Sequence, residues 1–193
     1  MYSSVLGGLD TAVWRFFRDF EFLVAVAEVY TQWGVSSILT PLALFVGVGL
    51  IMKNKPISLA VLPIVSLHVC GVLTAYLKSW TAVDRPPRSD WLAGASGGSF
   101  PSGHVANTTA CLVAIAVALT TGMVSSRTKT LIWISTGTLV AMMGWTRLAL
   151  RVHWFSDVVG GWLLGVAVAY GCHVVLTRFR RANPLRRLGH RAS

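Results

Sequence analysis

The residue types best suited to chemistry form three short groups separated by long uncharged stretches. Lys78 and Arg85 form the first group, Pro101-Ser102-Gly103-His104 the second, and Arg147, His153 and Asp157 the third. Ionisable residues close to apolar segments are usually retained for function, because a bilayer penalises them. We therefore treat all three groups as candidate functional residues.

His153 and Asp157 carry the clearest catalytic pattern. They are four residues apart at the start of a predicted helix and so lie on one face of it. A carboxylate hydrogen-bonded to one imidazole nitrogen fixes the tautomer and leaves the other nitrogen free to attack. Arg147 adds a guanidinium that fits two phosphate oxygens at once. The alternative is an interfacial salt-bridge cluster, and we interpret Arg151 as an interfacial cation or the partner of an acid.

The other two groups indicate anion binding. If the helix through Lys78 continues, Arg85 follows after almost two turns on the same face. Ser102 is placed to cap the next helix, Gly103 allows a ligand to approach the backbone, and a helix start attracts anions. His104 lies in that field. Snorkelling interfacial cations and a simple helix cap are the alternative interpretations.

Long uncharged runs provide the helices that must position these groups. The chain has 193 residues, 54% hydrophobic and only 12% charged, about half the charged share of soluble domains. A membrane-crossing helix needs about 20 mostly apolar residues. We predict one all-α domain over 1–193 in which Pro41 and Pro63 kink the first two transmembrane helices. The five predicted spans are 29–52, 56–78, 104–124, 128–148 and 154–177.

Residues 1–28 carry too many charges for a span, yet apolar residues recur at helical spacing. These are Val13, Phe16, Phe17, Phe20, Val24 and Ala27. We predict an amphipathic helix in the membrane interface, with a disordered aromatic-rich leader as the alternative. The segment lacks the pattern of a signal peptide, so we expect it to be retained.

The charged residues that give the net charge of +10 are distributed unequally between the two sides of the predicted membrane. Loops 53–55 and 125–129 and the basic tail 178–193 share one face, which holds ten basic residues and no acidic one. The positive-inside rule places that face, with the C-terminus, in the cytoplasm. We exclude nucleic acid as a partner, because the basic residues are juxtamembrane and no recognition motif accompanies them.

All three candidate groups fall on the opposite, extracytoplasmic face. Cations, an anion-binding helix start, two histidines and a carboxylate are what phosphoryl transfer through a histidine nucleophile requires. The loop 79–103 is either a lid over this site or a passive connector. The three cysteines, Cys70, Cys111 and Cys172, fall within spans, so we expect neither a disulfide nor a metal cluster.

The pattern Lys78-x6-Arg85-Pro86, Pro101-Ser102-Gly103-His104 and Arg147-x5-His153-x3-Asp157 resembles the signature of the type 2 phosphatidic acid phosphatases. These are lipid phosphate phosphatases, and the resemblance covers residues 56–177. One departure is Thr146, where the family usually has Ser. The resemblance implies an acid-phosphatase/haloperoxidase-like core in a multi-pass protein of the cell (inner) membrane.

The resemblance also implies a role for each matching residue. His153 attacks phosphorus, Asp157 orients it, and His104 protonates the leaving oxygen and then activates water. The phosphoryl oxygens are bound by Lys78, Arg85, Ser102, Gly103 and Arg147. No metal and no other cofactor is implied.

The substrate follows only from this resemblance and from topology. We expect a membrane lipid phosphate, with undecaprenyl diphosphate as the first choice and phosphatidylglycerol phosphate, phosphatidic acid and phosphorylated lipid A or glycolipids also open. A lipid phosphotransferase using the same histidine is one alternative. A non-catalytic lipid-binding membrane protein is the other. The sequence does not indicate an oligomeric state.

Overall fold

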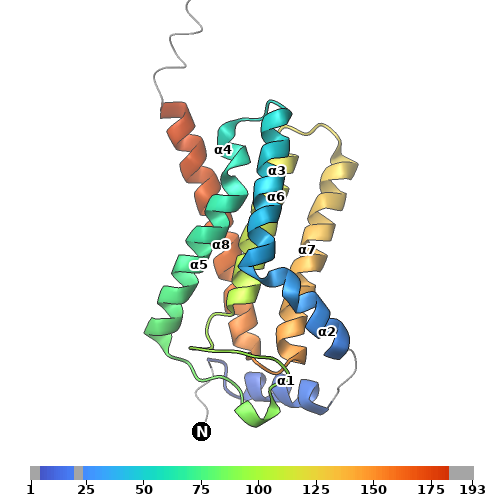
Figure 1. Cartoon of the computed structure of the whole chain (residues 1–193), viewed down its shortest axis with the longest axis vertical. Coiled ribbons are helices and arrows are strands. Elements are labelled where there is room, and N and C mark those ends of the chain that lie inside the picture. The colour runs from blue at the N-terminus through green and yellow to red at the C-terminus, as the bar shows by residue number, and fades with distance from the viewer. Residues whose placement is uncertain (1–4, 20–23, 183–193) are drawn as a thin grey trace, which may run out of the picture.

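All regular secondary structure in the part of the chain that the structure describes is helical. The computed structural model describes residues 5–19 and 24–182. Figure 1 shows the long helices running along one common direction, with α1 lying across one end of the bundle. The helices are α1 (Gly8–Asp19), α2 (Val24–Thr31), η1 (Gln32–Gly34), α3 (Ser36–Met52), α4 (Ile57–Ala60), α5 (Leu62–Thr81), η2 (Arg88–Asp90), α6 (Gly103–Thr120), α7 (Ser126–Ala149) and α8 (Phe155–Ala182).

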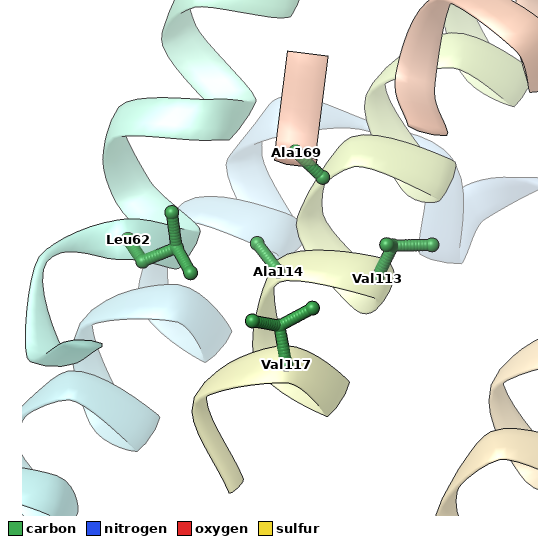
Figure 2. Close-up of a cluster of buried hydrophobic side chains, with 5 residues drawn as sticks. All are labelled: Leu62, Val113, Ala114, Val117 and Ala169. Carbon is green, nitrogen blue, oxygen red and sulfur yellow. The ribbon is translucent and has the colours of Figure 1, made fainter. Parts of the chain in front are cut away.

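Helix α6 forms the centre of the bundle. It packs against α3, α5, α7 and α8, and most of its length is buried. Figure 2 shows one of the clusters at which it meets α5 and α8, built from small and medium-sized side chains. Small residues let helices approach closely, which matters in a bilayer because lipid tails are as apolar as the helices themselves. The cluster consists of Leu62, Val113, Ala114, Val117 and Ala169.

Glycines on α8 allow its close contact with α6. A Cβ atom at Gly165 would lie only 2.5 Å from Cβ of Thr109 and 2.6 Å from the carbonyl oxygen of Ala106. One turn earlier, a Cβ atom at Gly161 would lie 3.0 Å from the carbonyl oxygen of Ser102. This close approach lies near the starts of α6 and α8, whose first turns carry His104 and Asp157.

The first predicted span is bent at a different residue from the one expected. The backbone is extended at Val35, and the helices on either side of it are bent by 55° relative to each other. Helix α3 continues through Pro41, so the large bend precedes that proline. Pro63 lies in the first turn of α5, where its missing N–H removes no helical hydrogen bond. Neither proline therefore marks the principal bend.

Within residues 5–19 and 24–182, three helices, α5, α6 and α8, are long and apolar enough to cross a membrane, and α2 with α3 would add a fourth as one bent span. Helix α7 is not among them, although its 24 residues extend over about 36 Å. Ser135, Thr136 and Thr138 lower its hydropathy. The all-helical class is confirmed, while the count of five spans stays a prediction.

The N-terminal segment forms two helices rather than one over 1–28. Helix α1 contacts α7 and α8, and α2 packs along α7. Phe17 and Val24 pack beside Ala27 in a cluster with Leu150, whereas Phe16 is exposed. Phe20 and residues 183–193 of the predicted basic tail lie outside the described residues.

Candidate active site

The three candidate groups converge at the end of the bundle crossed by α1. Lys78 lies near the end of α5, His104 in the first turn of α6, and Arg147 near the end of α7. His153 lies in the short connection between α7 and α8, and Asp157 in the first turn of α8. The loop from 82 to 102 passes over the same end (Figure 1).

His153 and Asp157 form a buried hydrogen-bonded pair. Nδ1 of His153 lies 3.0 Å from Oδ2 of Asp157, and the side chains are 3% and 0% exposed. Oδ2 also accepts from the backbone N–H of Trp154 at 2.8 Å and from the hydroxyl of Ser99. The carboxylate is therefore fixed from three sides.

The contacts of His153 assign its tautomer. Nη1 of Arg85 lies 3.1 Å from Nε2 of His153, and a guanidinium can only donate. Nε2 must then accept, which places the ring proton on Nδ1, where it is donated to Asp157. The Nε2 lone pair is thus directed toward the cations, as a nucleophile for a phosphoryl group requires.

Electrostatics keep this imidazole neutral. Burial lowers the pKa of His153 well below its ordinary value of 6.5, and the positive charges of Arg85, Arg147 and Lys78 lower it further. His104 acts on this pKa in the same direction, which places it within electrostatic reach of the pair. A neutral ring at neutral pH retains the lone pair that attack on phosphorus needs.

Lys78 and Arg85 are both enclosed by the loop that precedes α6. Nζ of Lys78 donates to the carbonyl oxygens of Gly98 and Ser99, at 2.6 and 3.1 Å. Arg85 donates to three carbonyls of the same loop and, at 2.7 Å, to the carbonyl of Val152. Burial lowers the pKa of Arg85, and the Asp157 carboxylate opposes that shift. The loop therefore holds both cations beside His153.

The close fit of this loop depends on glycine. A Cβ atom at Gly98 would lie 2.7 Å from the carbonyl oxygen of Lys78. Gly97 has φ +66°, a left-handed conformation in which other residues are strained. The glycine-rich stretch thus wraps the cations and is more than a passive connector.

Arg147 and Ser102 hold unused hydrogen-bonding capacity. Arg147 is 3% exposed and donates through Nη1 to the hydroxyl of Thr31 at 2.6 Å. Its Nε and the hydroxyl of the fully buried Ser102 find no partner among the described residues. We expected Ser102 to cap α6 with its side chain; it occupies the N-cap position but makes no capping bond. Buried donors of this kind normally have a partner, and a phosphoryl oxygen would provide one.

Two further residues near the site have simpler roles. The hydroxyl of Thr146 donates to the carbonyl of Met143 in its own helix, so the departure from the family's Ser leaves the candidate site unchanged in that respect. Arg151 is buried in a left-handed conformation and donates to the carbonyl of Arg18 on α1.

An open cavity of about 510 Å³ adjoins the candidate site. Lys78 and Arg85 line it, together with the aromatic ring of Trp91. His153 is not among its lining residues. Since Arg85 both lines the cavity and contacts Nε2 of His153, its guanidinium stands between the cavity and the candidate nucleophile.

Sequence reasoning missed Ser99, Thr31 and Asp10. Ser99 is fully buried and contacts Asp157, but only the path of the loop places it there. Asp10 is also fully buried, and its carboxylate accepts the backbone N–H and the hydroxyl of Ser156, at 2.8 and 2.7 Å. The sequence held one signal for this contact: Asp10 is an acidic residue in the first turn of the predicted amphipathic helix.

Comparison with known proteins gives a consistent result. Residues 59–181 match the PAP2 superfamily. The phosphatidylglycerophosphatase B of Bacillus subtilis is 31% identical over 155 residues, covering 78% of this chain and 75% of that protein. The crystal structure of a transmembrane PAP2 type phosphatidylglycerolphosphate phosphatase from Bacillus subtilis matches with a TM-score of 0.82 and 27% identity, over 94% of this chain and 90% of that one.

A more distant structure shares the fold. LpxE of Aquifex aeolicus matches with a TM-score of 0.63 at 22% identity, over 87% of this chain and 94% of that one. The matched region of the superfamily contains all three candidate groups, from Lys78 to Asp157. The resemblance to type 2 phosphatidic acid phosphatases is confirmed, and the chain belongs to the PAP2 superfamily.

Proposed function

We propose that this protein is a membrane phosphatase that hydrolyses the phosphate monoester of a phospholipid headgroup, with His153 as nucleophile. The observation that carries the proposal is the neutral, buried imidazole whose Nε2 lone pair is directed at a cluster of cations. Phosphatidylglycerol phosphate is the first candidate substrate, because the matching sequence and the matching crystal structure from Bacillus subtilis are both named for its hydrolysis.

The first chemical step forms a bond between Nε2 of His153 and phosphorus and breaks the bond from phosphorus to the lipid oxygen. With the negatively charged phosphate bound beside it and offsetting the cations, His104 is protonated and gives that proton to the leaving oxygen. Asp157 stabilises the positive charge that develops on the ring of His153, to which it is already hydrogen-bonded. Cations around the phosphoryl group stabilise its equatorial oxygens.

The second step returns the enzyme to its starting state. His104, now neutral, takes a proton from water, whose oxygen attacks phosphorus and breaks the bond to Nε2. Inorganic phosphate leaves, and both histidines regain their initial protonation states. Every group in the cycle belongs to this chain, and the described residues contain no set of three or more potential metal ligands.

Arg85 must change partners when substrate binds. In the structure its Nη1 donates to the lone pair that would attack. A phosphoryl oxygen is a stronger acceptor for a guanidinium than an imidazole nitrogen, because it carries negative charge. We propose that the incoming phosphate takes over this donor and so exposes Nε2 at the moment of binding.

An apolar cavity of about 290 Å³ offers a place for part of a lipid chain. Thr108 on α6 and Met143 on α7 line it, and each lies one helical turn from a candidate site residue, His104 and Arg147. Trp33 and Leu42 also line it. A lipid could therefore place its headgroup among the cations and a tail between α3, α6 and α7.

The orientation in the membrane is part of the proposal. The site end of the bundle faces away from the cytoplasm, and the end with the C-terminus faces it, as the distribution of basic residues predicts. No described residue singles out a diphosphate, so undecaprenyl diphosphate follows phosphatidylglycerol phosphate in the order of candidates.

The test is release of inorganic phosphate by the purified protein in uncharged detergent with EDTA present. The panel contains phosphatidylglycerol phosphate, phosphatidic acid and undecaprenyl diphosphate at matched concentrations. We expect the largest kcat/KM for phosphatidylglycerol phosphate. His153→Ala should abolish release, while His68→Ala, at an exposed histidine on α5, should retain it.

Other outcomes select the alternatives. Transfer of phosphate to an added lipid alcohol without release would indicate a phosphotransferase. Binding of every lipid without turnover would indicate a non-catalytic protein. Undiminished release by His153→Ala would refute the assignment of the nucleophile.

A further inference from the structure

A second polar cavity lies at the end of the bundle opposite the candidate active site. Its volume is about 380 Å³, within the usual size range of ligand pockets. It lies between the start of α4, the end of α6 and the C-terminal part of α8; α4 and the C-terminal part of α8 are near the top of Figure 1. The residues that line it are Lys55, Pro56, Ser58, Leu59, Thr121, Gly122, His173, Thr177 and Arg180.

The ionisable groups of this cavity are all basic. Lys55 and Arg180 contribute fixed positive charges, and His173 contributes an imidazole. The acidic residues that the structure describes are Asp10, Asp19, Glu28, Asp84, Asp90 and Asp157, and none of them lines this cavity. Neither Lys55 nor Arg180 forms a salt bridge within the described residues. The cavity therefore attracts an anion that the protein itself does not supply.

Buried polar atoms at the cavity also have unused capacity. Ser58 is 6% exposed, and its hydroxyl has no hydrogen-bond partner among residues 5–19 and 24–182. Nδ1 of His173 is buried and unpartnered in the same part of the chain. Lys55 reaches only the carbonyl oxygen of Thr121, at a long 3.4 Å. Buried polar groups normally find partners, so these atoms indicate a ligand rich in acceptor oxygens.

We propose that this cavity is a second binding site, specific for a phosphate group and separate from catalysis. A phosphate offers oxygens to Lys55, Arg180 and the Ser58 hydroxyl together, and two cations at one rim suit its charge. The group has two possible sources, the headgroup of an anionic phospholipid in the adjoining leaflet or free phosphate from the aqueous phase. Phosphate chemistry is common to both.

The test compares two variants of equal charge. Lys55→Gln with Arg180→Gln removes the cations that line the cavity. Lys53→Gln with Arg178→Gln removes two exposed cations from the same end that do not line it. Two probes separate the sources: inorganic phosphate, followed by the melting temperature in uncharged detergent, and phosphatidylglycerol, counted as bound lipids by native mass spectrometry.

We expect the cavity variant to weaken binding of one probe about tenfold, while the control variant stays within about twofold of the wild type. Loss of the phosphate response assigns the site to free phosphate, and loss of one bound lipid assigns it to a headgroup. Binding at the candidate active site is common to all variants and cancels in the comparison.

Ser58→Ala provides a second measurement with little risk to folding. It removes one unpartnered hydroxyl and should weaken the same probe, with kcat and the ligand-free melting temperature unchanged. Equal affinity and equal lipid count in the wild type and in both cavity variants would overturn the proposal. So would equal losses in the cavity variant and the charge-matched control, because that result reports net charge alone.

Discussion

Asp10 lies outside the region matched by the superfamily, yet its contacts make it a positioning residue for the candidate active site. Its carboxylate accepts the N–H of Ser156 at 2.8 Å, the hydroxyl of Ser156 at 2.7 Å and the N–H of Leu6 at 2.9 Å. Ser156 is the second residue of α8, and Asp157 follows it. Asp10 thus satisfies an N–H that every helix start leaves without an intrahelical partner.

Replacing Asp10 by Ala removes both carboxylate oxygens, and with them the acceptors of all three hydrogen bonds, from a fully buried position. A buried donor left without a partner costs about 1–3 kcal/mol, and bonds to a charged group lie at the upper end of that range. We expect a loss of about 3 kcal/mol in the free energy of unfolding. A shift of the first turn of α8 would displace Asp157 from His153, and small displacements of catalytic groups lower rates by about 10- to 100-fold.

The assay measures kcat, KM and melting temperature on phosphatidylglycerol phosphate. Asp10→Ala should lower kcat with little change in KM, and Asp10→Asn should recover much of it, because an amide oxygen can still accept from Ser156. Asp19→Ala serves as the matched control, since that acid is 60% exposed on the same helix. Wild-type kcat and melting temperature in Asp10→Ala would refute the reasoning.

Three further predictions concern the charge, the loop and the lipid chain. Because the pKa of His153 lies well below 6.5, the nucleophile stays unprotonated down to that pH. The decrease of kcat/KM on the acid side of its pH profile should therefore occur below pH 6.5. A decrease that begins above pH 6.5 would contradict the lowered pKa of His153. Gly98→Ala places a Cβ atom 2.7 Å from the carbonyl of Lys78 and should lower kcat/KM about tenfold, whereas Gly94→Ala, with open space around it, should be neutral. Thr108→Leu narrows the apolar cavity, and each methylene group of the lipid chain that it displaces costs about 0.8 kcal/mol. The kcat/KM value should therefore fall about fourfold or more for long-chain lipids but not for short-chain ones. Equal losses on both kinds of lipid would argue against a lipid tail in this cavity.

The sequence predicted which residues meet but not how they are held. The uncharged runs predict membrane-spanning helices, and successive helices of this kind alternate in direction. Lys78, His104, Arg147 and His153 were therefore expected at one end of the bundle. The bond from Ser99 to Asp157 depends on the three-dimensional path of a glycine-rich loop, which no periodic pattern encodes. Thr31 reaches Arg147 across 116 residues of sequence for the same kind of reason.

The N-terminal helices show where pattern reasoning led in another direction. Charges in residues 1–28 indicated an interfacial helix with a polar outer face, but the acid at Asp10 is the residue that α1 buries most completely. Its burial is stable only because α8 offers an N–H and a hydroxyl at the contact. The bend expected at Pro41 also lies elsewhere, at Val35. The extended backbone of Val35 interrupts the helix, whereas Pro41 lies near the start of α3 and does not interrupt it.

The central claim is that phosphate passes through a covalent bond to His153. The most direct measurement is rapid quenching of the purified protein with phosphatidylglycerol phosphate labelled in its terminal phosphate, followed by mapping of acid-labile label on the protein. We predict label on His153 in the wild type and none in His153→Ala. Label on another residue, or phosphate release by His153→Ala at the wild-type rate, would contradict the account.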